Sequence, residues 1–434
     1  GTFNIRNINL MGRLYQGGAR IRASRFQQLV QLDFINPRFI PDGERKFAPL
    51  TLSAQYSRDT GVTRFFRSTL DRGTFGVVQR LDEDGNPIDQ FGESTGAPSI
   101  NRLSFTAETS RTVSRKTRSF LFLRYRFEDV RILNTTSLLV APILEPDRNV
   151  RLSSLGGTFS RDTRANCNNK RTILEQIRTG EVGDPCRYNP TDATKGEFLT
   201  IDYALSLRQL GGNVSFSKLQ VTYQRYYQIK QLNKTVIAGR AIFGLASIFN
   251  AQDRNNNGTI DENDKTLPIS ERFFAGGSTD LRGFAFQQAG PRIAILPQGQ
   301  FRDRNNDPIT LFPFTIPFGG NALAVINAEA RIPLTTIFQI VPFYDGGNVF
   351  RRVGEIFKPR VSTPNDIVNQ NLRAVFTNTF GLGLRLKTPI GGSVNIDYGY
   401  ILNPPAFIVP EQNLPNSTLR LRQGQFHFRF TQAF

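Results

Sequence analysis

The stretch Val394-Asn-Ile-Asp-Tyr-Gly-Tyr400 alternates large apolar residues with polar or very small ones at every step. Successive side chains of a β-strand point to opposite faces. A strand here would therefore place the four large side chains on one face and Asn395, Asp397 and Gly399 on the other. The stretch predicts a strand whose one face is apolar and whose other face carries charge and glycine.

The same alternation recurs in about fifteen segments along the chain. Leu382 and Leu384, for example, alternate with Gly383 and Arg385. Short connections follow long ones rich in Asn, Asp, Gly and Pro, as the turns and outer loops of a membrane barrel do. A soluble β-sandwich has the same local pattern. The number, length and hairpin spacing of the strands favour an all-β fold, a transmembrane antiparallel β-barrel occupying residues 1–434.

Composition excludes several classes of protein. No apolar run approaches the roughly 20 residues that a spanning helix requires, so the chain is not a helical membrane protein. Lys and Arg number 54 against 36 Asp and Glu, a net charge of +18. These charges are spread along the chain without a basic run or a nucleic-acid-binding motif, so no nucleic acid is expected as a partner. We expect the basic residues to face the lumen and the lipid phosphates.

No arrangement of residues points to catalysis. The sequence has no phosphate-binding loop and no set of zinc ligands, and its single histidine is His427. A hydrolase would need an inward-facing Ser or Asp beside His427, which is more simply a residue of the barrel wall. We expect a protein that is not an enzyme and requires no cofactor.

Cys167 and Cys186 are the two cysteines of the chain, and they lie in a polar segment without other metal ligands. A metal site needs more Cys or His. The sequence predicts a disulfide formed in an oxidising compartment, with two free thiols as the alternative.

Residues 253–264 have the spacing of a calcium-binding loop. A glycine, Gly258, holds the sixth position. The ligands would be, in order, Asp253, Asn255, Asn257, Thr259, Asp261 and Asp264. Asp replaces the usual last Glu and no helices flank the loop, so we expect weak Ca²⁺ binding; the alternative is a turn that binds no ion.

The segment from residue 249 to 319 is too long for an ordinary connection and is predicted to be functional. Its tetrad Leu281-Arg282-Gly283-Phe284 closely resembles the sixth-loop signature of the superfamily of BamA/TamA-type outer-membrane protein assembly factors, which also includes the two-partner-secretion translocators. The resemblance implies a loop folded back into the lumen. It also implies that Arg282 pairs with Glu329 and Asp345, since residues 321–333 and 342–350 resemble the two following strands.

The C-terminus resembles the β-signal of outer-membrane proteins. Its residues are the glycine Gly424 and the aromatics Phe426, Phe428, Phe430 and Phe434. The resemblance implies that Phe426, Phe428 and Phe430 face lipid, that His427 faces the lumen, and that this last strand forms the seam of the barrel.

The resemblance extends over the whole chain but departs from the family at two places. It implies a sixteen-strand barrel of which about fifteen strands lie in this chain. The first strand and the polypeptide-transport-associated (POTRA) repeats are expected upstream of Gly1. Residues 165–188 interrupt a compact periplasmic turn, so the resemblance puts the cysteine pair on the periplasmic side.

The function implied is that of an insertase in the bacterial outer membrane, a multi-pass protein that folds and inserts nascent β-barrel proteins through its lateral seam. Its partners would be those clients, outer-membrane lipids, accessory lipoproteins and periplasmic chaperones. The alternatives are a polypeptide translocator of the two-partner-secretion type and a passive porin.

Overall fold

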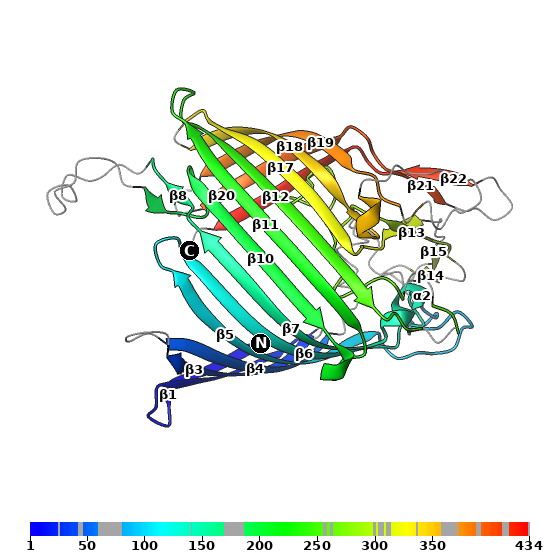
Figure 1. Cartoon of the computed structure of the whole chain (residues 1–434). Coiled ribbons are helices and arrows are strands. Elements are labelled where there is room, and N and C mark those ends of the chain that lie inside the picture. The colour runs from blue at the N-terminus through cyan, green and yellow to red at the C-terminus, as the bar shows by residue number, and fades with distance from the viewer. Residues whose placement is uncertain are drawn as a thin grey trace.

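The computed structural model describes most of the chain (Figure 1). The described residues are 1–24, 27–41, 47–59, 80–139, 141–168, 186–254, 258–260, 264–297, 301–302, 308–309, 314–335, 337–356, 371, 373–387, 392–409 and 416–432. No helix among them is long and apolar enough to cross a membrane.

One antiparallel sheet of fifteen strands dominates the structure, as the alternation predicts. Each strand pairs with its sequence neighbour in the sheet, the hairpin order of an up-and-down barrel. In chain order the strands are β1 (Thr2–Leu10), β2 (Tyr15–Ala23), β3 (Gln27–Pro41), β4 (Phe47–Asp59), β5 (Ser99–Ser114), β6 (Ser119–Leu133), β7 (Asn149–Asp162), β10 (Gly196–Ser206), β11 (Ser215–Ile229), β12 (Thr235–Phe249), β17 (Ala322–Pro333), β18 (Phe338–Phe350), β19 (Thr377–Lys387), β20 (Gly392–Ile401) and β23 (Gly424–Gln432).

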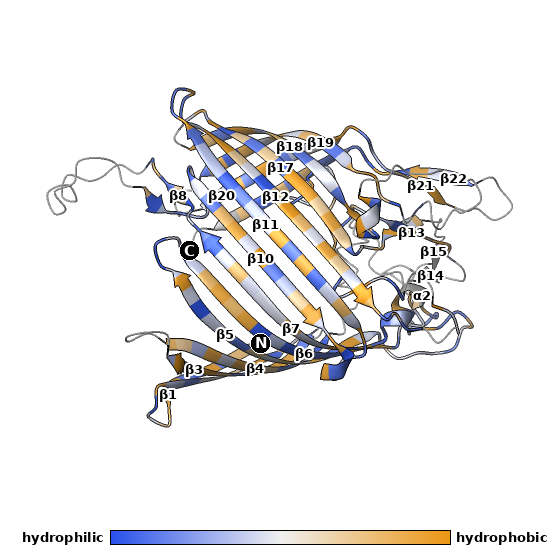
Figure 2. Ribbon diagram, in the orientation of Figure 1, coloured by the Kyte–Doolittle hydropathy of each residue, from blue (hydrophilic) through white to orange (hydrophobic). Residues whose placement is uncertain are grey.

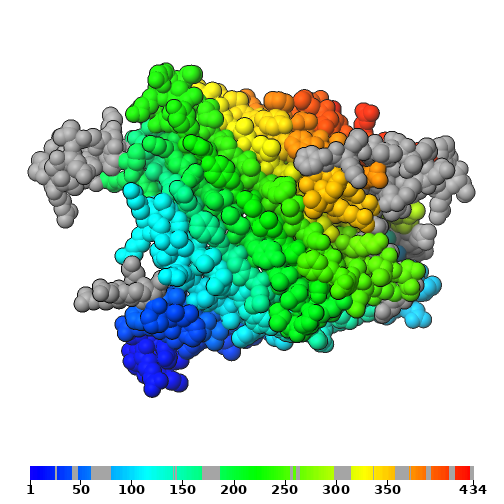
Figure 3. Space-filling view, in the orientation of Figure 1, coloured from blue at the N-terminus to red at the C-terminus, as the bar shows by residue number. Residues whose placement is uncertain are grey.

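The sheet curls into a barrel wall that stays open along one line. Among the described residues, β1 pairs only with β2 and β23 pairs only with β20. Figure 3 shows the outer sides of β10, β11 and β12 as a continuous surface of side chains. The edge strands of the described sheet are thus β1 and β23, and the wall between them is continuous.

The wall is apolar outside and polar inside, because strand residues alternate between the two faces. Ile326 on β17, Leu382 on β19 and Phe428 on β23 are exposed on the outer face, whereas Asp345 and Asp397 are buried on the inner one. Figure 2 shows the matching alternation of apolar and polar bands across the strands. The parity expected for residues 394–400 is therefore confirmed.

Long connections gather at one end of the barrel (Figure 1). They hold the short elements α2 (Ala141–Leu144), η1 (Glu145–Asp147), η2 (Arg208–Leu210), β13 (Arg292–Ile295), β14 (Phe301–Arg302), β15 (Pro308–Ile309), β16 (Phe314–Pro317), η3 (Val353–Glu355), β21 (Ala406–Val409) and β22 (Ser417–Arg420). Leu138, Leu144, Ile269, Ile316 and Phe318 form a buried apolar cluster in this cap. The cap therefore has an apolar core of its own.

The turn between β7 and β10 carries β8 (Ala165–Asn166) and β9 (Arg187–Tyr188), which pair with each other. A disulfide joins Cys167 to Cys186 beside this pair, so the predicted bridge is confirmed. Asp192 of the same turn accepts a 2.6 Å ion pair from Lys387 at the end of β19. This contact ties the cysteine-bearing turn to a strand distant in the sequence.

Removing the disulfide, in a Cys167→Ser/Cys186→Ser variant, is expected to loosen the turn and leave the barrel folded. The bridge spans 19 residues, and closing a loop of that size contributes about 3 kcal/mol in the chain-entropy model. β7 and β10 keep their nine paired positions without it. Limited proteolysis should show faster cleavage between residues 167 and 186, with unchanged heat-modifiable gel mobility; loss of the folded band would contradict this.

Candidate functional site

The long connection between β12 and β17 turns back into the barrel. Leu281 and Phe284 are buried there in an apolar cluster together with Ile401 of β20 and Val325 of β17. The loop residues on either side of Arg282 thus pack against the inner faces of β17 and β20. This fold-back is the one that the tetrad at residues 281–284 implies.

Arg282 is held by two carboxylates. Its Nε and Nη2 donate to the two oxygens of Asp345 at 2.7 Å each, and its Nη1 donates to Glu329 Oε1 at 2.6 Å. The backbone N–H of Arg282 also donates to Asp345, at 3.1 Å. Two parallel bonds from a guanidinium to one carboxylate are strong and fix its orientation. The ring of Phe343 lies 3.4 Å from the guanidinium carbon and closes the remaining side.

Strand register explains why both carboxylates reach one arginine. Asn327 of β17 lies opposite Asp345 of β18, and Glu329 lies two residues further along the same inner face. Asn327 donates to Asp345 at 2.7 Å and to the backbone carbonyl of Asp280. Asp345 is fully buried. The amide of Asn327 therefore joins the loop to the carboxylate that binds Arg282.

The structure brings three further polar residues to Arg282 that the sequence reasoning did not place there. Asp397 of β20 lies 3.9 Å from Arg282 and accepts a 2.5 Å ion pair from Arg385 of β19. His427 of β23 lies 2.8 Å from the backbone carbonyl of Arg282 through its Nε2. The inward parity of Asp397, Arg385 and His427 was visible in the sequence. Their convergence on Arg282 was not, because it depends on the path of the loop.

Glycines of the wall make room for the loop. A Cβ on Gly399 would lie 2.5 Å from the backbone carbonyl oxygen of Arg282, and one on Gly283 would lie 2.4 Å from Ile401. The loop backbone thus lies against a strand surface without side chains, the close approach for which strand glycines serve. Inward-facing glycines were the only sequence signal of this contact.

A second anchor holds the loop to the opposite part of the sheet. Glu271 of the loop accepts ion pairs from Arg126 of β6 at 2.5 Å and from Lys218 of β11 at 3.2 Å. Burial raises the pKa of the Glu271 carboxyl, but Arg126 and Lys218 outweigh it and hold that pKa below its ordinary value. Opposite charges consequently hold the loop to the strands of the sheet at Arg282 and again at Glu271. The sequence reasoning found only the contact at Arg282.

The C-terminal strand has the orientation that the resemblance implies. The phenyl rings of Phe426, Phe428 and Phe430 on β23 are exposed on the outer face, and Gly424 begins the strand. Tyr398 of β20 packs against Phe426 with ring centroids 4.5 Å apart. Phe434 lies outside the described residues.

The predicted calcium loop is only partly described. Asp253 accepts a hydrogen bond from the backbone N–H of Gly258, and the buried Asp264 accepts one from the backbone N–H of Arg254 at 2.9 Å. Thr259 is described, whereas Asn255, Asn257 and Asp261 lie outside the described residues. Calcium binding by this loop stays a prediction.

Calorimetric titration tests that prediction. We expect the purified chain to bind one Ca²⁺ in about the millimolar to submillimolar range, the range of extracellular modules. Asp253→Ala should abolish the heat, and Asp82→Ala in a different loop should not. No heat at millimolar calcium would show that the loop is an ordinary turn.

More than half of the sequence matches a known protein family. Residues 186–434 match the Omp85 superfamily domain. The chain belongs to the Omp85 superfamily. Membership in this superfamily, together with the barrel wall, implies a protein of the bacterial outer membrane. It also agrees with the resemblance carried by Arg282, Glu329 and Asp345.

A solved structure shows the same fold. BamA from Haemophilus ducreyi lacking POTRA domains 1–3 superposes with a TM-score of 0.53 at 15% identity, covering 99% of this chain and 66% of that chain. CdiB from Escherichia coli gives a TM-score of 0.46 at 11% identity, covering 100% of this chain and 60% of that one. The chain therefore spans less than two thirds of each of these proteins. At such identity the likeness to BamA shows the fold alone.

Proposed function

We propose that this Omp85 protein is the barrel of an insertase that folds nascent β-barrel proteins into the outer membrane. The proposal rests on membership in the superfamily and on the C-terminal strand β23, which resembles a β-signal and exposes Phe426, Phe428 and Phe430 on its outer face. An unpaired edge offers backbone N–H and C=O groups to another strand. A client strand bearing its own β-signal would add to this edge by β-augmentation.

The proposal needs no catalytic residue and no nucleotide. Backbone hydrogen bonds of the client, together with burial of its apolar face in lipid, supply the free energy. The exposed rings of Phe426 and Phe428 flank the proposed pairing edge with an apolar outer surface. Nascent barrels and outer-membrane lipids are the direct partners in this scheme; accessory lipoproteins and periplasmic chaperones would deliver the clients.

Depletion of the protein from its own cell tests this function. Outer-membrane β-barrel proteins should fall in abundance, while helical inner-membrane proteins stay constant as the control. Site-specific crosslinking from positions on β23 should capture client strands during depletion recovery. Unchanged barrel levels, with no crosslinked client, would reject the insertase.

Conductance separates the insertase from a porin. The loop lies inside the lumen at Arg282 and is anchored again at Glu271, and an occupied lumen passes few ions. Small, flickering single-channel currents are expected in planar bilayers, whereas a passive porin gives large, steady ones.

A translocator of the same superfamily is distinguished by loss of one secreted polypeptide on depletion, with barrel proteins unaffected.

A further inference from the structure

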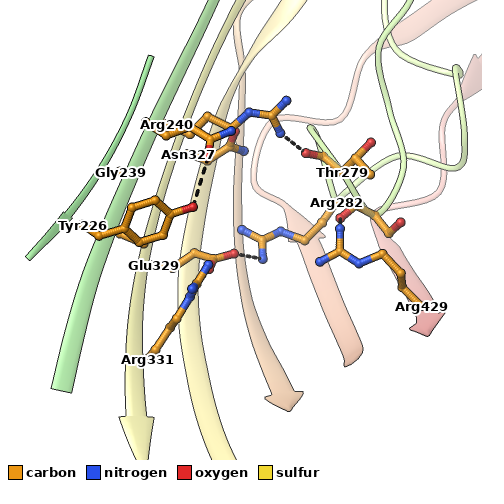
Figure 4. Close-up of a pocket in the computed structure, with 12 residues that line it drawn as sticks. Tyr226, Gly239, Arg240, Thr279, Arg282, Asn327, Glu329, Arg331 and Arg429 are labelled. Atoms are coloured by element: carbon orange, nitrogen blue, oxygen red, sulfur yellow. Dashed lines mark hydrogen bonds and ion pairs between the residues drawn. The ribbon is translucent and has the colours of Figure 1, made fainter. Parts of the chain in front are cut away.

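A polar cavity of about 190 Å³ lies in the lumen beside the loop. Figure 4 shows Arg240, Arg282, Arg331 and Arg429 directed toward it from three strands and from the loop. Glu329 is the single carboxylate of its lining. The lining of this small lumenal cavity therefore carries four guanidinium groups and one carboxylate, a strong excess of positive charge.

The carboxylate of this lining is already engaged. Glu329 accepts from Arg282 at 2.6 Å and from Arg331 at 3.1 Å. The rest of Arg282 is paired with Asp345, which lies outside the lining. The one carboxylate of the lining is therefore shared by Arg282 and Arg331, and it makes no direct contact with the other two arginines.

Arg240 on β12 and Arg429 on β23 form no ion pair with a carboxylate in the described part of the chain. Their side chains donate only to backbone carbonyls of the loop, Arg240 to Thr279 and Arg429 to Ser278. The Nε atom of each is buried without a hydrogen-bond partner among the described residues. Asp280 and Glu329 act on Arg240, and Asp397 and Glu329 act on Arg429, only at longer range. A half-buried guanidinium with no carboxylate in direct contact is unfavourable, so such groups are normally paired.

We propose that this cavity binds a phosphate-sized oxyanion between Arg240 and Arg429. Guanidinium groups bind phosphate oxygens through paired N–H donors. Ser278 and Thr279 also line the cavity, and their hydroxyls are further donors for an oxyanion. The anion supplies the negative charge that the lining lacks.

Such an anion would link three parts of the barrel. Arg240 belongs to β12 and Arg429 to the edge strand β23, and Ser278 and Thr279 belong to the loop between them. Four strands separate β12 from β23 in the sheet. One bound anion would therefore tie the loop to the far wall and to the edge strand together, independently of whether the protein inserts clients.

Titration calorimetry with inorganic phosphate, on the full chain folded in zwitterionic detergent at constant ionic strength, tests the site. We expect one phosphate per chain. Arg240→Gln and Arg429→Gln should each weaken binding at least about tenfold, because each removes charge-assisted hydrogen bonds. Arg225→Gln is the matched control: Arg225 is exposed on β11 between Gln224 and Tyr226, which line the cavity, so it takes the opposite face.

Folding of each variant is checked by heat-modifiable gel mobility. If a glutamine variant fails to fold, Arg240→Lys and Arg429→Lys keep the charge while removing the guanidinium, and they should still weaken binding. The bound phosphate group could belong to a lipid headgroup or to a soluble anion, and detergent doped with phosphatidylglycerol distinguishes the two. If the lipid competes with inorganic phosphate, the site binds a lipid headgroup; if it does not compete, the site binds a soluble anion. No phosphate binding at millimolar concentration, or equal loss in Arg225→Gln, would overturn the proposal.

Discussion

Replacing Arg282 with methionine is expected to release the loop from the lumen wall. Methionine keeps most of the apolar length of the side chain but removes every charge-assisted bond to Asp345 and Glu329. Asp345 is fully buried, and removing one partner of a buried ion pair destabilises by about 3–5 kcal/mol, because the other charge is left uncompensated. The fraction of molecules with a detached loop should rise about a hundredfold or more.

Three measurements follow the release of the loop in Arg282→Met. Protease cleavage within residues 264–297 should accelerate, single-channel conductance should rise, and the abundance of client barrels should fall in a complementation assay. The double variant Arg282→Met/Asp345→Asn should recover part of the stability, because it removes the orphaned charge. Arg225→Met is the control for loss of an arginine outside the lumen. A protected loop in Arg282→Met would show that the ion pairs do not hold it.

Replacing Gly399 with valine is expected to displace the loop even though every charged partner remains in place. A Cβ at this position would lie 2.5 Å from the carbonyl oxygen and 2.7 Å from the carbonyl carbon of Arg282. Both are backbone atoms, which cannot move aside by a change of rotamer. Overpacking of this kind destabilises by about 1–3 kcal/mol, and by more where backbone must shift.

Gly239 supplies the matched control for Gly399→Val. It lies on β12 of the same sheet, and a Cβ there meets nothing within 4 Å. Gly239→Val should leave the loop protected, since valine also favours strand conformation. Faster proteolysis of the loop in Gly399→Val, with Gly239→Val unchanged, is the expected pair of results. Equal behaviour of the two variants would mean that the close approach at Gly399 has no part in holding the loop.

The sequence by itself determined the wall of this barrel. Alternation along residues 394–400 assigns Asp397 and Gly399 to the inner face and Tyr398 to the outer one, and the structure has them so. This succeeds because the period of two is a property of each strand alone and needs no knowledge of its neighbours. The predicted Cys167–Cys186 bridge is likewise present.

The pairing of Arg282 with Glu329 and Asp345 came from a resemblance, and periodicity supplied only the inward parity of Glu329. Which oxygens meet which nitrogens depends on register between β17 and β18 and on the path of a long loop. The sequence pattern carries neither of these.

Only the tertiary structure decided what surrounds that pairing. Glu271 meets Arg126 across 145 residues of sequence, and the carbonyl of Arg282 passes over Gly399. Arg240 and Arg429 come to one cavity from strands that four others separate. The sequence could not predict these contacts because each of them joins inner faces across the lumen. Barrel curvature and loop docking set such distances, whereas the sequence fixes only the face to which each side chain points.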